Sequence, residues 1–129
     1  MIKSYQLNSY VKETEGKGRG VFALRSLGED ETVEVAPLLV LSEADSLTVE
    51  ETVLTCYQYY FNEKQVAIGL GHSSLYNHSD EPNAEFLMDE ESKTVTIKAL
   101  RNIDKDEEIL LDYGYSLNEN SVGDHSSVD

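Results

Sequence analysis

The sequence predicts a mostly β fold with little helix, and three observations lead to that prediction. Apolar and polar residues alternate with a period of two in several short runs, as expected of half-buried strands. Turn-forming residues separate these runs at intervals of about eight to twelve residues, which favours a β-rich domain over a helical one. Only one stretch carries the signals of a helix. A chain of 129 residues is long enough for one hydrophobic core, so we expect a single domain.

The expected strands are short, and they either follow turn signals or alternate in polarity. The runs 20–24 and 108–111 are apolar and come directly after turns, which is typical of buried strands. Residues 32–35 alternate polar and β-branched side chains, as a half-buried strand does. Residues 84–88 and 95–99 lie on either side of a short acidic turn, and we expect them to pair as a hairpin.

Residues 42–54 are the one helical candidate. Ser42 suits the N-cap position because its hydroxyl can accept a hydrogen bond from a backbone N–H of the first turn. Glu50 and Glu51 suit a first turn, where the helix dipole favours negative charge. We therefore expect a short helix in this region and strands elsewhere.

The chain is strongly acidic, with 25 Asp and Glu residues against 10 Lys and Arg residues and a formal net charge of −15. Between residues 26 and 92 the only Lys or Arg is Lys64. Such a field repels the phosphates of nucleic acid and attracts cationic partners such as Lys-rich protein tails. The alternative is that the negative charge only keeps the protein soluble.

Other classes of function find little support in the sequence. No apolar run is long enough to span a membrane, and the first residues lack the apolar core of a signal peptide, so we expect a cytoplasmic protein. The single cysteine, Cys56, excludes a disulfide within the chain and a four-cysteine zinc site. His72 and His78 have no third His or Cys at the spacing of a zinc site, and the acidic turn 104–108 lacks the Gly and Glu spacing of an EF-hand. We therefore expect no metal site.

Three motifs, taken in order along the chain, carry the functional signal. Each has a purely structural interpretation when it is taken alone: a tight turn, an Asx turn around a core histidine, and a buried aromatic residue that ends a strand. The motifs are Gly16-Lys17-Gly18-Arg19-Gly20, then Leu75-Tyr76-Asn77-His78-Ser79-Asp80-Glu81-Pro82-Asn83, and finally the run from Asp106 to Asp112-Tyr113-Gly114.

Together and in this order, the motifs resemble the SET-domain family, which transfers a methyl group from S-adenosylmethionine to a lysine side chain. The resemblance spans residues 16–114. It implies a SET-domain fold of short, β-clip-like sheets, with knot-like threading of the C-terminal segment beside the Asn77 turn. It also implies S-adenosylmethionine as cofactor and, as substrate, a protein with an accessible lysine. The acidity of the chain suggests that this substrate is basic.

The resemblance assigns the cofactor-binding residues by position. Lys17, Gly18 and Arg19 are expected to contact the cofactor through their backbone, because glycines permit close backbone approach. The Asn77 amide is expected to accept from the cofactor ammonium, while the His78 backbone meets the adenine and its side chain holds the turn. The expected cofactor-binding residues are Lys17, Gly18, Arg19, Tyr76, Asn77, His78 and Tyr113.

The resemblance also assigns the catalytic residues and the channel that holds the lysine. Tyr113 is expected to place its hydroxyl near the transferring methyl and to orient the lysine nitrogen. A phenol with a pKa of about 10 is mostly protonated at neutral pH, so Tyr113 suits orientation better than general base catalysis. Tyr57 is the expected second catalytic tyrosine, with Tyr59 on the same strand face as the alternative. Tyr57, Tyr59 and Tyr115 are the expected channel residues, although residues 57–61 could equally form an aromatic core strand.

The C-terminal stretch departs from the pattern of the family, in which a cysteine-rich zinc segment often closes the lysine channel. Beyond Gly114 this sequence is polar, rich in Ser and without cysteine. We therefore expect one domain over residues 1–117 and a flexible acidic tail over residues 118–129. The cover of the channel would then come from Tyr115 and Leu117 or from a second subunit in a homodimer.

Two alternative functions remain at this point. The chain could be a catalytically silent SET-fold module that binds a basic peptide or a partner protein, or it could methylate a small amine or another side chain. The joint presence of Asn77, His78 and Tyr113 favours an active enzyme. The absence of the cysteine-rich segment favours the silent module.

Overall fold

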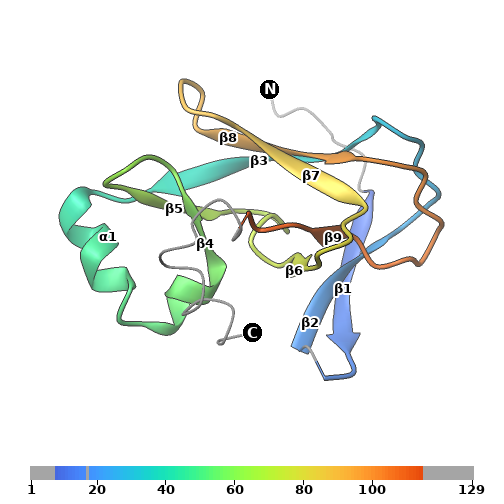
Figure 1. Cartoon of the computed structure of the whole chain (residues 1–129), viewed down its shortest axis with the longest axis horizontal. Coiled ribbons are helices and arrows are strands. Elements are labelled where there is room, and N and C mark those ends of the chain that lie inside the picture. Colours follow the sequence, from blue (N-terminus) through green and yellow to red (C-terminus); the bar gives the residue numbers. More distant parts are fainter. Residues whose placement is uncertain (1–7, 17, 115–129) are drawn as a thin grey trace, which may run out of the picture.

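The computed structural model describes residues 8–16 and 18–114, and within them the protein is mostly β, as predicted (Figure 1). None of the helices in these residues is long and apolar enough to cross a membrane. The elements are β1 (Ser9–Thr14), β2 (Gly18–Ala23), β3 (Thr32–Val40), α1 (Glu43–Val49), the 3₁₀ helix η1 (Val53–Tyr57), β4 (Gln58–Tyr60), β5 (Val66–Gly69), β6 (Asn77–His78), β7 (Ala84–Asp89), β8 (Thr94–Ala99) and β9 (Leu110–Leu111).

The strands form two sheets. β1 and β2 are an antiparallel pair, and the other strands form a mixed sheet in the order β4-β5-β3-β8-β7-β9-β6. Within the mixed sheet, β9 runs parallel to both β6 and β7, whereas the other pairs are antiparallel. Figure 1 shows α1, β4 and β5 at one end of the molecule and the β1–β2 hairpin at the other, with β6 and β9 between them.

The predicted hairpin is confirmed as β7 and β8, which pair from Ala84 opposite Ala99 to Asp89 opposite Thr94. Val95, Ile97 and Ala99 of β8 are fully buried, while the residues between them are half-buried. This alternation follows from the pleat of a strand, which directs successive side chains to opposite faces of the sheet. The period of two in the sequence therefore identified the core face correctly.

The predicted helix is present, but it is shorter than residues 42–54. Ser42 is the N-cap, and its hydroxyl accepts from the backbone N–H of Asp45 at 3.1 Å. The helix ends at Val49, so Glu50 and Glu51 follow its last turn, and the expectation that they begin a helix was wrong. Thr52 is extended and caps a separate 3₁₀ turn, because its side chain accepts from the N–H of Leu54.

The predicted strand 108–111 is reduced to Leu110 and Leu111, although Ile109 is fully buried as well. Short bridges join this C-terminal run to the first part of the chain, at Phe22 opposite Glu108 and at Leu27 opposite Ile103. Burial of the apolar side chains thus holds the C-terminal segment in the core even where no regular strand forms. The expected tail, residues 118–129, lies outside the described residues.

Candidate active site

The three sequence motifs meet where β6 lies parallel to β9. Asn77 is opposite Leu110 and His78 is opposite Leu111, so the Asn-His turn lies directly beside the strand that leads to Tyr113. The Asn77 amide nitrogen donates to the Arg19 carbonyl at 3.1 Å and to Glu108 Oε2 at 2.8 Å. One side chain therefore contacts the glycine-rich turn and the acidic turn together. We call Arg19, Asn77 and Glu108 the Asn77 cluster.

Gly20 makes this close approach possible. A Cβ atom at position 20 would lie 2.5 Å from Glu108 Oε2 and 3.0 Å from the Asn77 amide nitrogen. The first distance is too short for a carbon atom and the second is tight, so any side chain at this position would displace the Glu108 carboxylate and crowd the Asn77 amide. The glycine pattern in the first motif is thus explained at Gly20 by packing, whereas Gly18 has a positive φ of 72°.

Asn83 holds β9 in place, a role that the sequence did not reveal. Its side chain is 1% exposed, its amide nitrogen donates to the Glu108 carbonyl at 2.8 Å, and its amide oxygen accepts from the Leu110 N–H at 2.8 Å. A buried amide with both ends paired to one strand fixes the position of that strand. The sequence feature that could have indicated this role is the Pro-Asn pair that ends the second motif.

Tyr113 is anchored at both its backbone and its hydroxyl. Its N–H donates to His78 Nδ1 at 3.1 Å, and its hydroxyl donates to the carbonyl of Tyr76. Because Nδ1 accepts, the ring hydrogen of His78 lies on Nε2, which is 3.1 Å from Asp80 Oδ1. The rings of His78 and Tyr113 also contact each other, with 5.1 Å between centroids. His78 therefore positions the segment that carries Tyr113.

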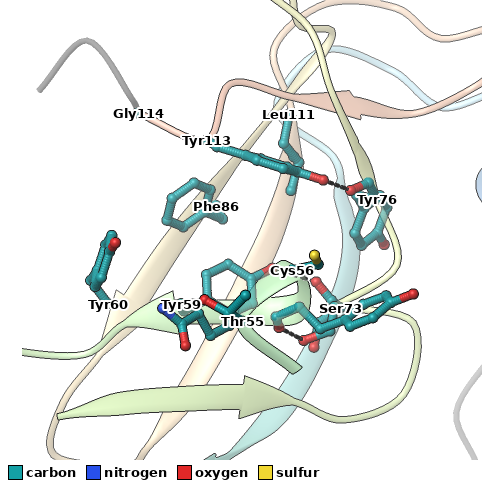
Figure 2. Close-up of a pocket in the computed structure, with 13 residues that line it drawn as sticks. Thr55, Cys56, Tyr59, Tyr60, Ser73, Tyr76, Phe86, Leu111, Tyr113 and Gly114 are labelled. Atoms are coloured by element: carbon teal, nitrogen blue, oxygen red, sulfur yellow. Dashed lines mark hydrogen bonds between the residues drawn. The ribbon is translucent and has the colours of Figure 1, made fainter. Parts of the chain in front are cut away.

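A cavity of about 200 Å³ lies beside Tyr113, and aromatic side chains make up about half of its lining residues. Figure 2 shows the Tyr113 ring at one side of it and Thr55, Cys56 and Tyr59 at the opposite side. We call it the aromatic cavity. It is lined by residues 55–60, Ser73, Ser74, Tyr76, Phe86, Leu111, Tyr113 and Gly114.

The two expected channel tyrosines both line this cavity, but they differ in structure. Tyr57 ends the 3₁₀ helix, so the expectation that it shares a strand with Tyr59 was wrong. Tyr59 lies on β4, donates its hydroxyl to the Ser73 carbonyl, and packs edge-on against Phe86. Burial raises the pKa of Tyr59 far above its ordinary value. Within the described part of the chain the Tyr57 hydroxyl has no hydrogen-bond partner, so it remains available to a ligand.

The backbone separates the Asn77 cluster from the aromatic cavity. Successive side chains of an extended chain point to opposite sides. Accordingly, Tyr76 is 2% exposed and lines the cavity, while Asn77 points to the glycine-rich turn. The predicted site residues thus fall on two sides of one short strand. Lys17 and Tyr115 lie outside the described residues.

His72 and His78, the histidines within the described residues, each bond to a side chain of the protein. His72 Nδ1 is 2.9 Å from the Ser9 hydroxyl, and His78 is paired with Asp80. Across residues 8–16 and 18–114 there is no group of three or more His, Cys, Asp or Glu side chains that could hold a metal ion. Bonds within the protein therefore explain the positions of His72 and His78.

Comparisons with known proteins agree with this arrangement. The family profile described as SET domain matches residues 18–114. A Schizosaccharomyces pombe histone-lysine N-methyltransferase, specific for lysine 37 of histone H3, is 33% identical over 105 residues, which cover 81% of this chain and 71% of that protein. A solved Plasmodium falciparum structure, provisionally assigned as a histone methyltransferase, aligns with a TM-score of 0.67 and 30% identity over 85% of this chain and 96% of its own. The chain therefore belongs to the SET-domain family of protein-lysine methyltransferases.

Proposed function

We propose that this chain transfers a methyl group from S-adenosylmethionine to a lysine of a basic protein segment. The cofactor would bind at the Asn77 cluster, and the lysine would enter the aromatic cavity. The observation that carries this proposal is the position of Tyr113, whose ring lines the cavity while its backbone is bound to the residue that follows Asn77. The cofactor and the lysine would then approach from the two sides of the segment formed by Tyr76, Asn77 and His78 and meet beside Tyr113, where the lysine nitrogen can reach the methyl directly.

The residues at the Asn77 cluster fit the polar part of the cofactor. The carbonyl of Arg19 and the carboxylate of Glu108 both face the Asn77 amide, and such oxygen atoms suit the cofactor ammonium group. Arg19 and Gly18 are exposed, so a ligand can reach their backbone. When bound, S-adenosylmethionine would supply an electrophilic methyl group on a sulfonium centre. The roles of Gly18, Arg19, Tyr76, Asn77 and His78 in binding it are part of the proposal.

The aromatic cavity suits the other reactant. Its rings would pack against the methylene stem of a lysine and attract its cation by their faces. A dry, apolar site favours the neutral amine over the ammonium ion, and the amine must be neutral to attack. Tyr113 would orient the nitrogen through its hydroxyl, and Tyr57 has a hydroxyl left for the same purpose. Because attack on a methyl group needs no covalent enzyme intermediate, orientation and electrostatics would supply most of the acceleration.

The substrate follows from charge and from the relative. The Schizosaccharomyces pombe protein acts on histone H3, and histone tails are rich in lysine. A net charge of −15 would attract such a tail, and added salt would weaken that attraction. We therefore expect methylation of basic segments to fall as salt is raised. A rate that does not change with salt would mean that the acidity serves only solubility.

The proposal is tested by calorimetry followed by methyl transfer. S-adenosylmethionine should bind and raise the melting temperature, because a ligand selective for the folded state stabilises it. Radiolabelled methyl should then appear on histone H3 and on basic proteins of a cell extract. Absence of binding at millimolar cofactor would overturn the proposal. Binding of a basic peptide without transfer would indicate a silent module, and transfer to free amines alone would indicate another substrate class.

We also propose that a second copy of the chain helps to close the aromatic cavity in a two-fold homodimer, the commonest assembly of identical chains. Gly114, the last residue that the structure describes, lines this cavity, which supports a cover supplied by later residues or by another subunit. Light scattering measures the oligomeric state. A monomer that keeps full activity after truncation at Gly114 would show that activity needs neither the later residues nor a second subunit to cover the cavity.

A further inference from the structure

A phenol–carboxylate pair joins buried Tyr76, which lines the aromatic cavity, to half-buried Glu34 on β3. The hydroxyl of Tyr76 donates to Glu34 Oε1 at 2.7 Å, and the Tyr76 side chain is only 2% exposed. The other carboxylate oxygen, Oε2, accepts from the backbone N–H of His72 at 2.8 Å. Glu34 therefore joins β3 to the segment that leads into β6, with each oxygen bound to a donor of that segment.

The backbone makes room for this carboxylate. Gly71 has a positive φ of 62°, and a Cβ atom there would lie 2.6 Å from Glu34 Oε2. A side chain at position 71 would be strained by the backbone conformation and would also collide with the carboxylate. The glycine at position 71 thus leaves room for the Glu34 carboxylate in the position that it occupies.

Residue 76 links this pair to the catalytic tyrosine. Its phenol is held by Glu34, while its own backbone carbonyl accepts the hydrogen bond of the Tyr113 hydroxyl (Figure 2). Burial, reinforced by the negative charge of Glu34, raises the pKa of Tyr76 well above its ordinary value. Tyr76 therefore remains a protonated donor to Glu34 throughout the neutral pH range.

We propose that Glu34 is a positioning residue for methyl transfer and that it acts on Tyr113 through Tyr76. The carboxylate fixes the phenol of Tyr76, the fixed residue holds its carbonyl in one place, and that carbonyl sets the position of the Tyr113 hydroxyl. Small displacements of an orienting group are costly, with a shift of about 1 Å worth roughly a hundredfold in rate. This inference rests on the role of Tyr113 in the proposed function.

The first test compares Glu34→Gln and Tyr76→Phe with a matched control pair. Tyr10 also donates its hydroxyl to a carboxylate, Asp106 Oδ1, at 2.8 Å, but this pair is exposed and outside the cavity. We expect Glu34→Gln and Tyr76→Phe each to lower kcat by about ten- to a hundredfold. For Glu34→Gln, the KM for peptide and the Kd for S-adenosylmethionine should change less than about twofold, since Glu34 lines neither the aromatic cavity nor the Asn77 cluster.

The controls, Tyr10→Phe and Asp106→Asn, should leave kcat within about twofold of the wild type. If Glu34→Gln and Tyr76→Phe lower only the melting temperature and leave kcat intact, the pair is structural and the proposal is overturned. Tyr76→Phe keeps the aromatic ring and the carboxylate, so it remains informative even if Glu34→Gln does not fold.

The second test is a double-mutant cycle with Tyr113→Phe. If Glu34 acts through the Tyr113 hydroxyl, then Glu34→Gln should cost no further rate once that hydroxyl is absent, although it should still lower the melting temperature. An equal loss of kcat in both backgrounds would overturn the proposal. A Tyr113→Phe variant with unchanged kcat would instead contradict the proposed function itself, so the two failures are distinguishable.

Discussion

The Asn77 cluster and the aromatic cavity lie on opposite sides of the same short strand, yet they are built differently. The cluster is open at Gly18 and Arg19, and its contacts are a carbonyl and a carboxylate around one amide. In the cavity, the hydroxyls of Tyr59 and Tyr113 each donate to a backbone carbonyl. In the Asn77 cluster, groups of a ligand can replace the internal hydrogen-bond partners of the amide. The aromatic cavity holds its hydroxyls in fixed positions.

This difference suggests a division of labour. Side chains that can exchange partners contribute to affinity, because the ligand replaces an internal bond. Side chains whose partners are fixed contribute to orientation, because the transition state finds them already in place. Changes in the Asn77 cluster should therefore appear mainly in cofactor affinity, and changes in the aromatic cavity mainly in turnover.

The largest effect is expected for Tyr113→Phe. The variant loses the hydroxyl that would orient the reacting nitrogen, so kcat should fall by about ten- to a thousandfold. Cofactor affinity should change little, because the hydroxyl is bound to the Tyr76 carbonyl on the side of the cavity. Steady-state kinetics and calorimetry measure the two quantities. A large loss of cofactor affinity with an unchanged kcat would instead assign Tyr113 to cofactor binding and not to turnover.

Asn77→Ala should show the opposite pattern. Removing the amide deletes the link between Arg19 and Glu108, together with the oxygen assigned to the cofactor ammonium. A hydrogen bond to a charged group contributes about 1.5–3 kcal/mol, so the Kd for S-adenosylmethionine should rise by roughly ten- to a hundredfold. At saturating cofactor kcat should fall much less. A loss confined to kcat would show that Asn77 does not bind the cofactor.

Gly20→Ala should damage the Asn77 cluster from the opposite strand. The added methyl would lie 2.5 Å from Glu108 Oε2, and overpacking of this kind typically costs about 1–3 kcal/mol of stability. Thermal unfolding should show the loss, and calorimetry should show weaker cofactor binding. Gly28→Ala is the matched control, because a Cβ at position 28 meets its nearest atoms at 4.0 Å. If both variants were equally stable, the close approach at Gly20 would not matter.

The last kinetic prediction concerns pH. A free lysine has a pKa of about 10.4, so its neutral amine becomes about a hundredfold more abundant between about pH 7 and pH 9, and activity should rise by up to that factor. The raised pKa values of Tyr59 and Tyr76 keep these phenols protonated over the whole range, so neither should limit the rate. Initial rates at saturating substrates measure the profile. A flat profile would mean that the acceptor is not an amine or that its deprotonation does not limit turnover.

Stability should depend on pH in a related way. The buried phenols of Tyr59 and Tyr76 have raised pKa values in the folded state, so their contribution is complete below the unfolded pKa of about 10 and is lost as the pH rises above it. Melting temperatures measured between about pH 8 and pH 11 should therefore decline most above about pH 10, and Tyr76→Phe should reduce that decline. A decline of equal steepness in the variant would assign it to other groups.

Much of the local structure could be predicted from the sequence. The β7–β8 hairpin was recognisable because the side chains of a half-buried strand alternate between the core and the solvent, which gives its sequence a period of two. The cap at Ser42 was recognisable because its partner, Asp45, is only three residues away. The length of the helix was not, because the side chain of Thr52 competes for a backbone donor and starts a new turn. The same turn moved Tyr57 off the strand that carries Tyr59.

By itself, then, the sequence determined the β-rich class, the hairpin, the helix cap and the three motifs that mark the SET-domain family. Only the tertiary structure decided how these parts meet. It pairs β6 with β9 in parallel, fixes β9 through hydrogen bonds of the Asn83 side chain, and joins Glu34 to Tyr76, which lie 42 residues apart. The physical reason is range. Alternation and caps reflect contacts between near neighbours in the chain, whereas a hydrogen bond across 42 residues depends on the packing of the whole core and leaves no local pattern.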